Sequence, residues 1–196
     1  MRIPTLPSVG EHVSVLVVCL GNVCRSPVAE RLLMMRLTHL LGDTADRVAV
    51  SSAGVQAVVG HPIDVHAAAE LTRLGGDPAG FAATQLTRPL VEAADLVLTA
   101  TSQLRSRALE EAPRALRRTF TLREFAAFAV TAEAVHDDGF RALVTQAAAH
   151  RSDIDPGDYD IPDPIGAPPE VHRQVADLLD AVCLTIASAL AGAITD

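Results

Sequence analysis

Aromatic residues and cysteines are both scarce in this sequence. Its 196 residues include no tryptophan, one tyrosine and five phenylalanines, so few aromatic side chains are available to stack on a substrate ring. The three cysteines are too few for a disulfide framework. Their spacing with the histidines does not match a zinc site. We therefore expect one well-buried core without structural disulfides, and no metal or other cofactor.

Positive charge is also limited. The chain has 16 Lys and Arg against 24 Asp and Glu, a formal net charge of -8, and a pI near 5.3. This balance argues against nucleic acid or an acidic membrane surface as a partner, and any anion site must be local. Residues 1–12 lack the features of a secretory signal, and the uncharged stretch 181–195 is shorter than the ~20 apolar residues of a membrane span. We expect a cytoplasmic protein without membrane insertion.

Predicted strands and helices alternate along the chain. Strands rich in Val, Leu or Thr are expected at residues 13–19, 47–52, 95–100 and 116–121, and helices at residues 27–41, 64–75, 101–111, 123–130, 137–150 and 168–193. Asp64 and Thr101 are expected to be the N-caps of two of these helices. Alternation favours right-handed crossovers between parallel strands. The fold class is therefore predicted to be α/β, a three-layer doubly wound sheet of four parallel strands with helices on both faces. We interpret residues 1–12 as an N-terminal extension and residues 13–196 as a single domain with a helical insertion at about 123–160.

The segment that follows the first strand has the features of an anion site that contains a nucleophile. After the strand come Cys19, five residues and Arg25, and then Ser26 and Pro27, which suit the N-cap and the first position of a helix. Free amides and the helix dipole at such a position favour a bound oxyanion and the thiolate form of Cys19. The guanidinium of Arg25 can hold two phosphate oxygens. The alternative is a buried structural cysteine beside a surface arginine.

The motif resembles the signature of the low-molecular-weight protein tyrosine phosphatases, Cys-x-Gly-Asn-x-Cys-Arg-Ser-Pro. Here the chain reads Cys19-Leu20-Gly21-Asn22-Val23-Cys24-Arg25-Ser26-Pro27. Further matches follow in order: Ser52-Ala53-Gly54, Ala94 to Thr99, and Ile161-Pro162-Asp163-Pro164. The resemblance covers about residues 13–194, and the spacing is most like that of the bacterial members. It implies the fold of that family and a phosphorylated protein as substrate, with bacterial tyrosine kinases among the candidate partners.

The resemblance also implies a mechanism. Cys19 is the nucleophile that forms a cysteinyl-phosphate, and Arg25 together with the loop residues binds the phosphate. Asn22, Ser26 and Ser52 support the loop, and Ser26 also stabilises the thiolate that leaves. The second cysteine, Cys24, is either a reversible disulfide partner of Cys19 or a small packing residue. The phosphate-binding residues are Leu20, Gly21, Asn22, Val23, Cys24, Arg25 and Ser26.

A proton donor for the leaving group is also required. Two Asp-Pro pairs compete for this role, Asp155-Pro156 and Asp163-Pro164. Asp163 precedes the last predicted helix and matches the general acid of the family, so it is the preferred assignment. The acidic run around Tyr159, which includes Asp155 and Asp160, is interpreted as a solvated loop.

The chain departs from the family at three places. Residues 81–85 read Phe-Ala-Ala-Thr-Gln where many members have His before Ala-Arg-Gln, so a polar partner of the catalytic loop is missing or replaced. Ile165 takes the place of an aromatic residue after Asp-Pro. Ala57 and Val58 stand where eukaryotic members have a large side chain. These changes predict weaker stacking on a phosphotyrosine ring.

Three other functions are considered. A protein-arginine phosphatase of the same fold would carry Thr at the position of Val23, which favours phosphotyrosine as the substrate. An arsenate reductase would need a further cysteine pair, whereas only Cys183 remains. A non-catalytic phosphate-binding module would not need Cys19, Arg25 and Asp163 together. The sequence therefore favours a protein-tyrosine phosphatase.

Overall fold

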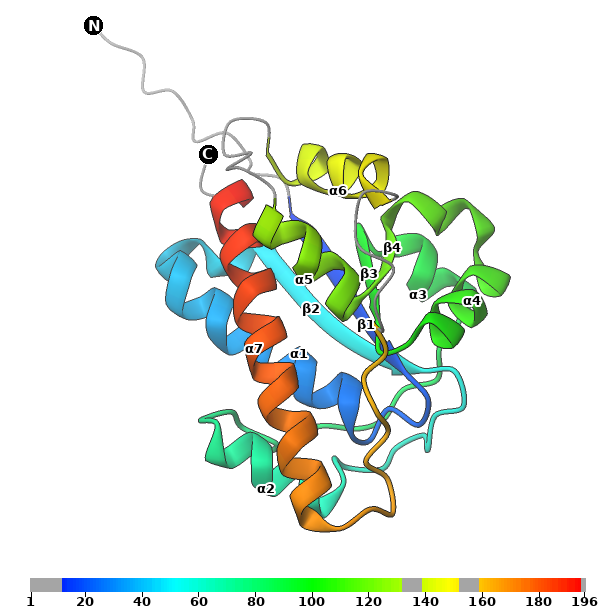
Figure 1. Cartoon of the computed structure of the whole chain (residues 1–196), viewed down its shortest axis with the longest axis vertical. Coiled ribbons are helices and arrows are strands. Elements are labelled where there is room, and N and C mark those ends of the chain that lie inside the picture. Colours follow the sequence, from blue (N-terminus) through cyan, green and yellow to red (C-terminus); the bar gives the residue numbers. More distant parts are fainter. Residues whose placement is uncertain (1–11, 132–138, 152–158, 195–196) are drawn as a thin grey trace, which may run out of the picture.

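The computed structural model describes residues 12–131, 139–151 and 159–194 (Figure 1). Four parallel strands form one sheet in the order β2-β1-β3-β4. The strands are β1 (Val13–Cys19), β2 (Val48–Gly54), β3 (Leu96–Thr99) and β4 (Thr119–Thr121). The α-helices are α1 (Arg25–Leu41), α2 (Val65–Arg73), α3 (Arg88–Ala93), α4 (Ser102–Glu111), α5 (Leu122–Thr131), α6 (Gly139–Ala149) and α7 (Pro169–Ile194). Two 3₁₀ helices, η1 (Gly42–Arg47) and η2 (Pro113–Arg118), precede β2 and β4.

Helices cover both faces of the sheet. Successive side chains of a strand point to opposite faces, so Val15 and Val17 pack into one core cluster with α1, α5 and α7. Leu16 and Val18 pack into a second cluster with residues of α3 and α4. Figure 1 shows α7 running beside α1 and α5 on the first of these faces. The predicted three-layer α/β architecture is confirmed.

The last helix, α7, is the longest element of the structure. Its 26 residues are long and apolar enough to cross a membrane by length and composition, and half of its most apolar 18-residue window is buried inside the protein. Leu179, Ile186 and Leu190 are at most 1% exposed and pack into the cluster that contains α1. Burying one such side chain is worth about 2 kcal/mol. The apolar face of α7 is therefore explained by its packing in the core.

Most predicted elements are present, with shifted boundaries. The predicted N-caps Asp64 and Thr101 each accept backbone N–H groups of the helix that follows. The prediction of Ser26 as an N-cap is wrong, because α1 begins at Arg25 and its N-cap residue is Cys24. The expected strand at 116–121 is shorter because residues 113–118 form η2. The short helix α3 was not expected.

The register of the sheet brings the end of β2 against the loop after β1. Cys19 pairs with Gly54, the last residue of β2. A Cβ atom on Gly54 would lie 2.6 Å from the carbonyl oxygen of Leu20 and 2.9 Å from the amide nitrogen of Asn22. Both neighbours are backbone atoms and cannot rotate away. Only glycine therefore lets these two segments approach so closely.

We predict that Gly54→Ala destabilises the fold. The added methyl group meets backbone on two sides, so the free energy of unfolding should fall by about 1–3 kcal/mol, measured by chemical denaturation. Gly21→Ala is the matched control, because its Cβ would approach nothing closer than the Val23 side chain at 3.5 Å. Equal stability of the two variants would contradict the prediction.

Candidate active site

The loop after β1 wraps around the sulfur of Cys19. This side chain is buried, at 2% exposure, at the carboxyl end of β1. Its Sγ atom accepts a hydrogen bond from the Asn22 amide at 3.2 Å and one from the Ser26 hydroxyl at 2.9 Å. Ser26 therefore contacts the sulfur from the first turn of α1, and its hydroxyl is not a helix cap. Both donors stabilise negative charge on the sulfur.

Asn22 holds the shape of this loop. It is a non-glycine residue with positive φ, at 55°, a region that asparagine tolerates better than most residues. Its side-chain amide donates to the hydroxyls of Ser26 and Ser52, each at 2.8 Å. Its side-chain oxygen accepts from the backbone amide of Thr84 at 2.7 Å. The fully buried side chain of Asn22 thus joins its own loop to β2 and to the segment around Thr84.

Residues 81–85, where the sequence departs from many family members, still contact the loop. The polar contact from this segment to Asn22 is made by the backbone amide of Thr84. The next residue, Gln85, accepts from the Ala57 amide at 3.0 Å and donates to the Val55 carbonyl at 3.0 Å. Backbone hydrogen bonds also run from Val58 to Gly21 and from Gln56 to Leu20. Residues 55–58 therefore form a wall fixed to the loop.

Glu30 completes the polar chain behind Asn22. Ser52 donates its hydroxyl to the Glu30 carboxylate at 2.6 Å. Burial raises the pKa of Glu30, and the Ser52 hydrogen bond opposes that shift. The sequence reasoning missed this residue. It lies four positions after Ser26, on the same face of α1, and this spacing was a signal that could have identified it.

Arg25 and Asp163 form an ion pair next to the phosphate-binding loop. Arg25 is 4% exposed at the start of α1 and donates to the carbonyl oxygen of Ile161 at 3.1 Å. Its other terminal nitrogen makes an ion pair with the Asp163 carboxylate, whose side chain is 32% exposed. The structure thus brings the candidate general acid beside the candidate phosphate-binding arginine. The rival acid, Asp155, lies outside the described residues.

Asp160 fixes the start of the segment that carries Asp163. Its carboxylate accepts from the Ser102 amide at 2.6 Å, at the N-terminus of α4, where helix amides need acceptors. The amide of Ile161 donates to the Ala100 carbonyl at 2.8 Å. Asp160 thus lies in a partly exposed loop, and both contacts fix this stretch near the carboxyl end of β3.

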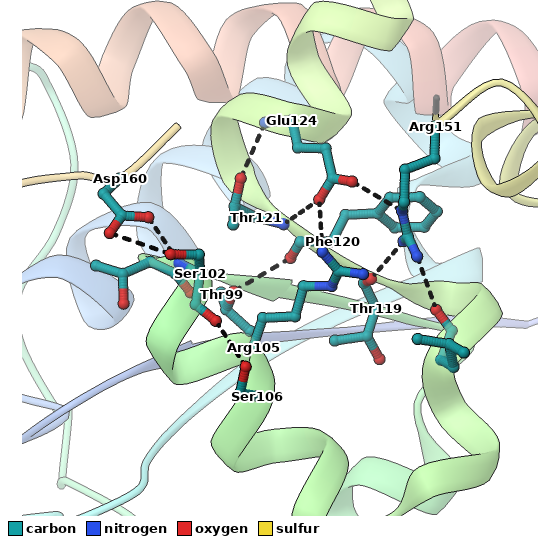
Figure 2. Close-up of polar contacts among 12 residues, drawn as sticks. Thr99, Ser102, Arg105, Ser106, Thr119, Phe120, Thr121, Glu124, Arg151 and Asp160 are labelled. Atoms are coloured by element: carbon teal, nitrogen blue, oxygen red, sulfur yellow. Dashed lines mark hydrogen bonds and ion pairs between the residues drawn. The ribbon is translucent and has the colours of Figure 1, made fainter. Parts of the chain in front are cut away.

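A charged cluster beside Asp160 joins the predicted insertion to the sheet (Figure 2). Glu124 of α5 is buried and makes ion pairs with Arg151 at 2.8 Å and with Arg105 at 3.8 Å. The Arg151 guanidinium also stacks on the Phe120 ring, 4.4 Å from its centroid. Burial lowers the pKa of Arg151, and the coulombic effect of Glu124 raises it. The cluster ties α4, β4 and α5 to the end of α6.

Cys24 lies behind the loop. Its side chain is 4% exposed, and all three cysteines of the chain are free thiols. Burial, followed by the charges of Asp64 and Asp163, raises the pKa of Cys24 to about 12. Near neutral pH the thiol of Cys24 is therefore protonated, which makes it a poor nucleophile.

Aliphatic side chains surround the loop on its exposed side. Leu20, Val58, Val59 and Ile165 are between 39% and 65% exposed. A cavity of about 410 Å³ lies elsewhere, between α6 and η2, and Asp95 and Arg118 are among its lining residues. Asp95 precedes β3 at the amino end of the sheet, so this cavity is on the side opposite to Cys19.

Comparison with known proteins places this geometry in a family. The family model described as low molecular weight phosphotyrosine protein phosphatase matches residues 14–194. The low molecular weight protein-tyrosine-phosphatase Etp of Escherichia coli (strain K12) is 42% identical over 90 residues, which are 46% of this chain and 55% of that protein. The matched region thus spans about half the length of the first curated relatives.

A longer match is found with a bacterial arginine phosphatase. The protein-arginine-phosphatase of Geobacillus stearothermophilus is 32% identical over 176 residues, which cover 90% of this chain and 95% of the relative. The solved structure titled YwlE arginine phosphatase from the same organism superimposes with a TM-score of 0.68 and 31% identity, covering 91% of this chain and 92% of that one. Because the family model matches residues 14–194 of this chain, the chain belongs to the low molecular weight phosphotyrosine protein phosphatase family.

Proposed function

We propose that this chain is a protein-tyrosine phosphatase that hydrolyses phosphotyrosine through a cysteinyl-phosphate intermediate. The observation that carries the proposal is the surroundings of Cys19, whose sulfur accepts hydrogen bonds from Asn22 and Ser26 inside a loop that also holds Arg25 beside Asp163. A nucleophile, a phosphate-binding cation and an acid are thereby held together. The substrate is a phosphorylated protein, and a bacterial tyrosine kinase is a candidate.

The first step forms the intermediate. The Cys19 thiolate attacks phosphorus while the loop amides and Arg25 bind the phosphate oxygens, so a sulfur–phosphorus bond forms and the bond from phosphorus to the tyrosyl oxygen breaks. Asp163 gives its proton to that oxygen, because a phenolate is otherwise a poor leaving group. The products of this step are the free tyrosine side chain and phosphorylated Cys19.

The second step releases phosphate. Asp163, now ionised, takes a proton from water as the water oxygen attacks phosphorus. The sulfur–phosphorus bond breaks and its electron pair returns to Cys19, where the Ser26 hydroxyl at 2.9 Å stabilises the thiolate. The charges that this chemistry requires come from Arg25 and from backbone amides, so the mechanism uses no metal.

A second candidate function is a protein-arginine phosphatase. The match over 95% of an arginine phosphatase supports it, whereas the match to Etp spans 55% of that protein. Val23 argues against it, because its partly buried side chain carries methyl groups where an arginine-specific member has a threonine. We keep phosphotyrosine as the proposed substrate.

Cys19→Ser should abolish turnover of p-nitrophenyl phosphate and of phosphotyrosine peptides. A serine hydroxyl stays protonated in this loop, so the covalent step is lost. Arg25→Lys should also be severely impaired, because a point charge does not replace a bidentate guanidinium. Cys183→Ser, which changes a buried thiol of α7, is the control and should remain active. Substantial activity of Cys19→Ser would remove this residue from the mechanism.

Asp163→Asn should slow turnover according to the basicity of the leaving group. General acid catalysis contributes about 10²-fold or more when the leaving oxygen needs a proton. The loss should therefore be large for phosphotyrosine and small for an aryl phosphate with an acidic phenol, and kcat measured over a series of such esters tests this. Asp155→Asn, at the other Asp-Pro pair, should have little effect. The reverse ranking of the two variants would refute the assignment.

Val23→Thr should raise activity on phosphoarginine relative to phosphotyrosine. The change keeps the branching of the side chain and adds a hydroxyl inside the phosphate loop. The ratio of kcat/KM for a phosphoarginine and a phosphotyrosine peptide is the measurement. A wild-type protein that already prefers phosphoarginine would show that the second candidate function is the right one.

A further inference from the structure

Three potential metal ligands meet behind the phosphate-binding loop. They are Cys24 at the N-cap of α1, Asp64 at the N-cap of α2, and His172 in the first turn of α7. The Cys24 sulfur, a carboxylate oxygen of Asp64 and a ring nitrogen of His172 all lie within 4.8 Å of one another. The three residues are far apart in the sequence, so their spacing along the chain gave no sign of such a site.

The imidazole of His172 has an unsatisfied nitrogen. The residue is 2% exposed, and among the described residues its Nδ1 atom has no hydrogen-bond partner. The nearest charged group is the Asp64 carboxylate, whose Oδ1 atom is 3.7 Å away, too far for a hydrogen bond. A buried polar atom without a partner costs about 1–3 kcal/mol. This nitrogen therefore lies close to the Asp64 carboxylate without a hydrogen bond to it.

The cluster borders a small cavity. A space of about 10 Å³ is lined by Cys24 and His172 together with Val28, Ala67, Pro164 and Val175 among others. That volume is about the space that one water molecule needs. Apolar residues form the rest of the lining, so Cys24 and His172 are its polar residues.

The ligand types identify the class of ion. A thiolate and an imidazole bind zinc well, and a carboxylate is a common third ligand, whereas magnesium and calcium require oxygen ligands. Zinc with a thiolate, a carboxylate and a neutral imidazole also carries no net charge, which reduces the cost of burial. Asp64 already accepts the amides of His66 and Ala67 through Oδ1, and this fixes its carboxylate in position.

We propose that Cys24, Asp64 and His172 form a zinc-binding site. On binding, the sulfur–hydrogen bond of Cys24 breaks, its proton passes to solvent, and the electron pair forms the sulfur–zinc bond. No oxidant or reductant takes part. The ion joins the phosphate loop to α2 and α7. It also occupies the sulfur of Cys24, which the family resemblance makes a candidate disulfide partner of Cys19.

Direct metal binding tests the site without any measurement of turnover. Zinc affinity is measured by competition with a chromophoric chelator, and cobalt is added separately because thiolate ligation gives it a charge-transfer absorption. Wild-type protein should bind one equivalent and show this absorption. His172→Gln and Asp64→Asn should each weaken zinc binding about tenfold or more. Asn is as good an N-cap as Asp, so Asp64→Asn should keep α2 intact.

Two controls complete the experiment. His39→Gln removes an exposed histidine of α1 and should bind zinc as the wild type does. Cys19→Ser should retain binding and the cobalt absorption, whereas Cys24→Ser should lose that absorption. Circular dichroism confirms that each variant is folded. The proposal is overturned if zinc binding depends on Cys19 and not on Cys24, or if His172→Gln and Asp64→Asn both bind zinc like the wild type.

Discussion

The conformation of Asn22 is the constraint on which the rest of the site depends. Its positive φ turns the loop so that its own amide reaches the Cys19 sulfur, and its side chain then contacts Ser26, Ser52 and Thr84. One residue therefore fixes the nucleophile, the start of α1, the end of β2 and the segment that leads to α3. The close approach that Gly54 permits is what allows β2 to take part in this arrangement.

The segment that carries Asp163 is held by hydrogen bonds of the two residues at its start, Asp160 and Ile161. Ile161 is fixed twice, through its amide to Ala100 and through its carbonyl to Arg25, and Asp160 before it is bound to Ser102. The position of Asp163 thus depends on the carboxyl end of β3 and on the N-terminus of α4. The Glu124 cluster supports the same region from α5 and the end of α6 (Figure 2). The residues of the predicted insertion that the structure describes help to frame the site in this way.

The sequence predicted those helices and strands whose own side chains indicate burial or a helix start. The continuous apolar run of β1, the spacing of buried residues in α7 and the N-caps Asp64 and Thr101 all have side-chain signals. The contact from Thr84 to Asn22 was not predictable, because it uses a backbone amide that any residue provides. Ser26 was misassigned as a cap because its hydroxyl is used by Cys19, a tertiary contact that local helix rules do not include. The spatial meeting of Cys24, Asp64 and His172 depends on helix packing that the sequence pattern does not describe.

The exposed aliphatic side chains around the phosphate-binding loop affect how a substrate approaches the protein. Leu20, Val58, Val59 and Ile165 carry no charge, and the protein as a whole has a formal net charge of -8. The net charge therefore does not attract a phosphate dianion from a distance, and salt screens what repulsion there is, so attraction is confined to the neighbourhood of Arg25 and the loop amides. For the proposed phosphotyrosine substrate, encounter is then not driven by electrostatic steering, and the uncharged side chains around the loop offer apolar contact instead.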